Sequence, residues 1–75
     1  MKTDRELLEE IKENNRRERL SCEINIRVGE RSKAGATDTV MSQIETFIKT
    51  QQGRIKDLAM GIEAIDDTIN EMSAE

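Results

Sequence analysis

The sequence contains no proline, histidine, tryptophan or tyrosine, one phenylalanine (Phe47) and one cysteine (Cys22). A single cysteine excludes a disulfide within the chain, and without histidine too few ligands remain for an ordinary zinc site. Because aromatic residues are almost absent, a core must be built from isoleucine, leucine, methionine and valine. A chain of 75 residues that lacks disulfides and metal usually gains its stability from a partner subunit.

Long apolar runs are also missing, so no segment is expected to cross a bilayer. The start of the chain, residues 2–6, is charged and offers no signal-peptide core. A free thiol is compatible with a reducing compartment. These features predict a cytoplasmic protein without membrane contact. The net charge is −4, and the acidic excess lies in residues 34–75, which argues against nucleic acid as a partner of that half.

Apolar residues recur at steps of three and four in the second half of the chain. This period predicts one long coiled-coil helix over residues 38–73, with a narrow apolar seam that another helix must cover. Its a and d positions are the predicted oligomer interface: Met41, Ile44, Ile48, Gln51, Ile55, Leu58, Ile62, Ile65, Ile69 and Met72.

Two residues could interrupt this helix. A break near Gly53 would make a helical hairpin, but the heptad frame continues across the glycine, from Ile48 to Ile55, which favours one helix. Gln51 is the one polar residue of the seam. It either fixes register, as buried polar residues of coiled coils do, or is a solvated defect.

Isoleucine at the a positions, with isoleucine and leucine mixed at d, favours bundles of three or four helices over two. Flanking positions lack the paired charges of a two-stranded zipper, and Phe47, Ala59 and Gly61 widen the apolar face instead. We therefore expect a homo-oligomeric bundle. The alternative is that the seam packs on the chain's own N-terminal part.

The N-terminal part predicts a short helix and one strand. Thr3 and Glu6 have the spacing of a capping box, and they predict a helix over residues 4–19 with a thin apolar face (Leu7, Leu8, Ile11). Five apolar residues then alternate with polar ones and predict a strand over residues 21–28, followed by a loop over 29–37. They are Leu20, Cys22, Ile24, Ile26 and Val28.

A single strand leaves both of its edges unpaired, so it would have to pair with its copy in a second subunit. The expected fold class is therefore mostly α, with a short N-terminal helix, an intersubunit ribbon and a long helix in an oligomeric bundle. The alternative is that Leu20, Ile24 and Val28, at steps of four, continue the first helix.

The segment Glu23-Ile24-Asn25-Ile26-Arg27-Val28 resembles the strand of ribbon-helix-helix repressors. The resemblance implies a dimer whose paired strands enter the major groove, where alternate polar side chains read bases. Arg31 and Lys33 would then hold phosphate. The candidate nucleic-acid contacts on this hypothesis are Asn25, Arg27, Arg31 and Lys33.

No group of residues combines a nucleophile, a base and oxyanion donors, and we expect neither catalysis nor a cofactor. The leading hypothesis is a small non-enzymatic homo-oligomer that acts by protein–protein interaction, as an adaptor, an inhibitor or an assembly factor. Its partners would be further copies of itself and another protein. The alternative hypothesis is a dimeric DNA-binding regulator of ribbon-helix-helix type.

Overall fold

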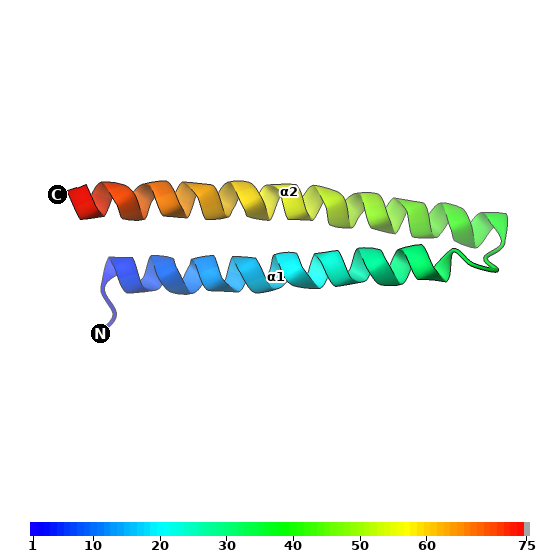
Figure 1. Cartoon of the computed structure of the whole chain (residues 1–75), viewed down its shortest axis with the longest axis horizontal. Helices are drawn as coiled ribbons and strands as arrows, with labels where there is room; N and C mark the ends of the chain where they lie inside the picture. The colour runs from blue at the N-terminus through cyan, green and yellow to red at the C-terminus, as the bar shows by residue number, and fades with distance from the viewer. Residues whose placement is uncertain (75) are drawn as a thin grey trace.

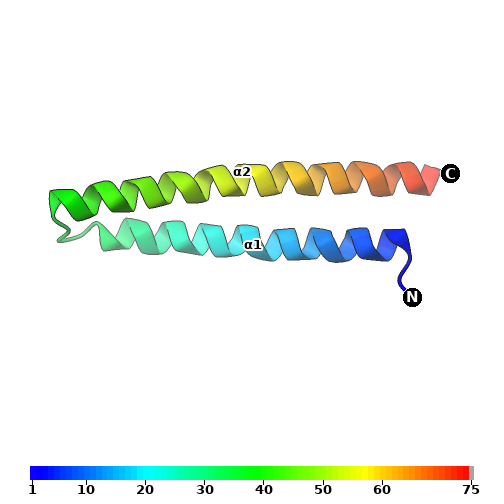
Figure 2. The same cartoon turned by 180° about the vertical axis from the view of Figure 1, so that it is seen from behind.

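The computed structural model describes residues 1–74 and folds them into two helices, α1 (Asp4–Ser32) and α2 (Asp38–Ala74). The helices run antiparallel and side by side, with both termini at one end of the hairpin (Figure 1). Figure 2 shows the same pairing from behind. The molecule measures 57 × 20 × 14 Å, so it is one helix thick, with two broad faces and two narrow edges.

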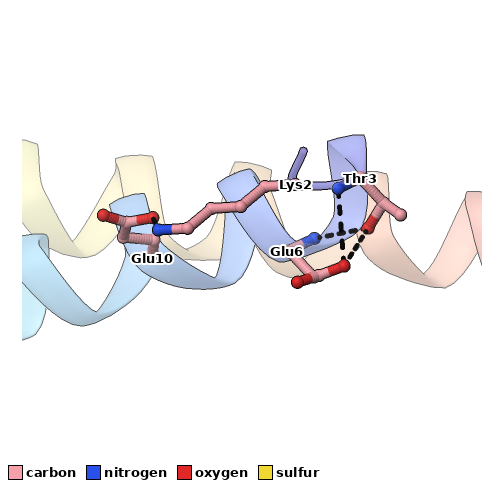
Figure 3. A network of polar contacts seen from close by, with 4 residues as sticks. All are labelled: Lys2, Thr3, Glu6 and Glu10. Carbon is pink, nitrogen blue, oxygen red and sulfur yellow. Dashed lines mark hydrogen bonds and ion pairs between the residues drawn. The ribbon is translucent and has the colours of Figure 1, made fainter.

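The predicted capping box at the start of α1 is confirmed. The backbone N–H of Glu6 donates to Oγ1 of Thr3 at 3.2 Å, and Oε1 of Glu6 accepts from the backbone N–H of Thr3 at 3.4 Å (Figure 3). Two otherwise unpaired N–H groups are satisfied in this way. Lys2 also forms an ion pair with Glu10, two helical turns after Thr3.

A short turn joins the two helices. Lys33 caps the end of α1, and Gly35 has a φ of 75°, in the left-handed region that glycine reaches without steric cost. Thr37 caps α2, because its Oγ1 accepts the backbone N–H of Val40 at 3.4 Å. The connection is therefore shorter than the predicted loop over residues 29–37, since Gly29 and the three residues after it belong to α1.

Within residues 1–74 there is no strand, so the predicted strand over 21–28 and the intersubunit ribbon are wrong. The first helix does not end near residue 19 but continues to Ser32. On a helix, residues two apart lie about 200° apart, so the alternating apolar residues divide into two stripes. Cys22 and Ile26 face α2, while Leu20 and Ile24 are exposed.

A physical reason favours the helix. A helix satisfies its backbone hydrogen bonds within its own segment, whereas the strand would need a second chain for every ladder bond. No proline or positive-φ residue between Arg19 and Gly29 forces the helix to stop. The mostly helical class therefore stands, and the fold is a helical hairpin.

α2 runs without a break through Gly53 and Gly61, and its heptad positions face α1 of the same chain. Ile48, Leu58 and Ile69 are buried. This intrachain packing was the alternative, and it becomes feasible because the longer α1 offers eight heptad positions along the contact. These α1 positions are buried or half-buried: Leu8, Lys12, Asn15, Arg19, Cys22, Ile26, Gly29 and Lys33.

Two glycine substitutions test the hairpin, because neither glycine has an atom within 4 Å of an added Cβ. Gly53 is helical, so Gly53→Ala should raise the free energy of unfolding by about 1 kcal/mol through helix propensity. Gly35 has a φ of 75°, so Gly35→Ala should lower it by about 1 kcal/mol. Urea denaturation at one fixed protein concentration measures both changes, and stabilisation by both substitutions would contradict the turn.

Candidate protein-interaction surfaces

The contact between the helices is apolar on the α2 side but partly polar on the α1 side. Cys22 and Gly29 are buried, and Gly29 lets Ile48 approach so closely that an added Cβ would lie 3.0 Å from its Cγ1. Towards the termini, α1 instead presents Lys12 and Asn15 to α2. Lys12 forms an ion pair with Asp66 and buries most of its side chain. The hairpin therefore covers its own seam only in part.

Gln51, the polar residue of the α2 seam, has a partner in α1. The side-chain amide of Asn25 donates to Oε1 of Gln51 at 3.3 Å. Any slip of one helix along the other would separate the two amides. This contact agrees with a role of Gln51 in register, although both side chains keep access to solvent.

One broad face carries exposed apolar side chains next to the seam. Val28, Val40 and Phe47 line a shallow groove near the turn, and Leu7 lines another near the termini. Together with Ile11 they keep between 43% and 59% of their surface exposed. We call this surface the apolar face: Leu7, Ile11, Val28, Val40 and Phe47. Uncharged residues occupy most positions around them, namely Asn14, Ser21, Ser32, Gln43, Thr50, Gly61 and Thr68. Asp57 and Glu71 continue the seven-residue spacing of Gln43 and Thr50 and lie where this face meets the outer edge of α2.

The centre of the apolar face holds a matched pair of charges. Nε and Nη2 of Arg54 donate to Oε1 of Glu18 at 2.9 and 2.6 Å. The pKa of Arg54 is raised, first by this hydrogen bond and then by the negative charge of Glu18. The two charges neutralise each other, so the pair leaves the face without net charge at its centre.

The opposite broad face is charged along its whole length. Its exposed or half-buried side chains carry charges of both signs, and burying them against an apolar partner would cost desolvation energy. They include Glu9, Arg16, Glu23, Glu30, Glu45, Lys49, Lys56, Glu63 and Asp66. The two broad faces therefore differ in character, and only one of them offers apolar surface.

The four candidate nucleic-acid contacts do not form one surface. Asn25 is bonded to Gln51 beside the seam, and Arg27, two residues on, points about 200° away from it. Lys33 pairs with Glu30 at 3.2 Å, and only Arg31 shares the outer side of α1 with Arg27. The grouping expected from a strand, with Asn25 and Arg27 side by side, does not occur on the helix.

The α1 half of the seam was not predicted, because Lys12, Asn15 and Arg19 are polar and interrupt the apolar period that would indicate a buried face. A weak signal exists in the seven-residue spacing of Leu8, Asn15, Cys22 and Gly29. Leu20 and Ile24 were predicted on the apolar side of a strand, and only the alternative of a continued helix placed them on one helical stripe.

No protein-family model matches the chain, and neither the curated proteins nor the solved structures contain a match. Among the described residues, no helix is long and apolar enough to cross a membrane.

Replacing Asn15, a polar residue of the α1 seam, by an apolar residue tests the contact between the helices. Asn15 is half-buried, and the missing side chain of Gly61 leaves space beside it. Asn15→Leu keeps nearly the same shape and should raise the free energy of unfolding by about 1–2 kcal/mol through apolar burial and helix propensity.

The matched control is Asn70→Leu, at an exposed position of α2, which should change stability by at most about 0.5 kcal/mol. Urea denaturation compares the two variants. Equal effects of both substitutions would mean that Asn15 does not lie in the contact between the helices.

Proposed function

We propose that the protein is a non-enzymatic protein-interaction module that works as a pair of hairpins. The apolar face of one copy packs on the apolar face of a second copy, and the four helices form a bundle. The exposed apolar side chains on one broad face, with a charged face opposite, are the observation that carries this proposal. In such a bundle each α2 has two neighbours, as its heptad composition favours.

The surface area of the hairpin supports pairing. A single chain exposes 5802 Å², whereas a compact protein of this mass exposes about 4,700 Å². The excess of about 1,100 Å² exceeds the area of about 800 Å² that each partner buries in a standard interface. A broad face of 57 × 20 Å is large enough to bury such an area.

The Glu18–Arg54 pair fits the same arrangement. A lone buried charge would oppose association, but these two are already paired within one chain and bring no net charge into the interface. Side chains of a second copy can enter the groove that Val28 and Phe47 line and the groove that Leu7 lines.

The paired hairpins leave their charged faces free, and we propose that these faces bind another protein, in the role of an adaptor, an inhibitor or an assembly factor. We place the protein in the cytoplasm, because its one cysteine is a free thiol. The ribbon that the DNA-binding alternative requires is absent from residues 1–74, so that alternative is not retained.

Phe47→Glu tests the pairing. Two carboxylates would be buried in each pair, so the dissociation constant should rise at least about a hundredfold. Sedimentation equilibrium in about 0.5 M NaCl, which screens surface charges, should give twice the chain mass for the unmodified protein. The variant should give the mass of one chain at the same concentration.

The matched control is Leu20→Glu, which adds the same charge at an apolar residue that is 56% exposed and lies outside the apolar face. It should keep the doubled mass. A single-chain mass for the unmodified protein, or equal loss of mass with both variants, would contradict pairing through the apolar face.

A further inference from the structure

The outer edge of α1 carries a stripe of basic and apolar residues. Leu20 and Ile24 are 56% and 49% exposed, although they lie on the side of α1 that faces away from α2. Arginines precede and follow them at steps of three and four. We call this stripe the basic edge: Arg17, Leu20, Ile24, Arg27 and Arg31.

The outer edge of α2 carries the same pattern with the opposite charge. Met60, 61% exposed, and Ala64 take the places of the two apolar residues, and carboxylates take the places of the arginines. We call this stripe the acidic edge: Asp57, Met60, Ala64, Asp67 and Glu71. Each member lies 40 positions after its counterpart in the basic edge, so the steps of three, four, three and four are identical.

Most of these charges have no partner within the hairpin. Among the ion pairs of residues 1–74, the only edge residue is Arg17, which lies 3.6 Å from Glu13 one turn away on its own helix. Arg27 and Asp67 are exposed on opposite edges and do not meet. The hairpin therefore presents two complementary stripes that cannot satisfy each other within one copy.

We infer that the basic edge of one hairpin binds the acidic edge of a second hairpin, with α1 of one copy parallel to α2 of the other. Steps that average 3.5 residues are the period at which two helices keep a common seam. The parallel register places Arg17 beside Asp57, Arg27 beside Asp67 and Arg31 beside Glu71. Between these charged layers, Leu20 meets Met60 and Ile24 meets Ala64.

The position of the stripes along the hairpin suits this register. The basic edge lies in the half of α1 nearer the turn, and the acidic edge lies in the half of α2 nearer the termini (Figure 1). Turning the second copy end over end, so that the helices in contact run parallel, brings the two stripes to nearly the same height. Two neighbouring hairpins then overlap along most of their length.

This contact joins two different surfaces, so it does not close on itself. A heterologous interface adds further copies in a row, whereas face-to-face pairing stops at two. The inference therefore extends the proposed function from a pair of hairpins to a chain of them. It rests on separate residues and stands or falls independently of the apolar face.

Salt separates the two contacts. Ion pairs between exposed side chains weaken as salt shortens the Debye length from about 20 Å in 20 mM NaCl to about 4 Å in 0.5 M NaCl. Sedimentation velocity of the full chain in about 20 mM NaCl should give a weight-average mass at least about twice that in 0.5 M NaCl. An unchanged mass would overturn the inference.

Charge reversal then tests the register. Arg27→Glu and Asp67→Arg should each abolish the salt-dependent growth, and the double variant R27E/D67R should regain it, because each copy again carries complementary edges. The matched controls are Lys49→Glu and Glu45→Arg, which make similar charge changes at exposed positions outside both edges and should keep the growth. Circular dichroism checks that every variant remains helical.

Two further results would overturn the inference. Growth that is lost with Arg27→Glu but kept with Asp67→Arg would mean that the basic edge binds something other than the acidic edge. Failure of R27E/D67R to regain growth, with both single variants deficient, would exclude this register. A single-chain mass in 0.5 M NaCl with growth at low salt would contradict only the proposed face-to-face pair.

Discussion

The contact between the apolar seam of α2 and the partly polar seam of α1 determines the rest of the structure. α2 has apolar residues at nearly every heptad position of the contact. The facing residues of α1 are small or apolar near the turn and polar nearer the termini: Cys22, Ile26 and Gly29, then Lys12, Asn15 and Arg19. Two helices side by side can cover only one stripe of each other. The large apolar side chains outside these stripes are exposed, and the surfaces that they form are the candidate binding surfaces of the protein.

The distribution of the remaining apolar residues is not uniform. They lie on one broad face and on the two edges, and the second broad face is charged. A random distribution would give a hairpin that aggregates without preference, whereas this one offers a face without net charge at its centre and edges of opposite charge. The same helices can therefore support one contact driven by apolar burial and another driven by charge.

The long helix and the cap at Thr3 could be predicted because their signals are local: a seven-residue period and a Thr–Glu pair three residues apart. The strand was wrong because an alternation of period two over nine residues also fits two helical stripes. One stripe holds Cys22 and Ile26 and the other holds Leu20 and Ile24. The choice depends on what lies opposite the segment, and α2 is distant in sequence.

The same reasoning explains why the edges could not be recognised before the fold. The residues of the basic edge, from Arg17 to Arg31, cross the boundary between the predicted helix and the predicted strand. Their spacing of three and four residues indicates a common face only if the whole segment is helical. Once α1 is continuous to Ser32, the five residues share one edge and match the stripe that begins at Asp57. The role of Gly29 also depends on the continuous helix. The sequence predicted that a loop begins at Gly29, but in the structure Ile48 packs against the backbone of α1 there. A residue that begins a loop in a wrong assignment can thus lie in the contact between the helices of the correct one.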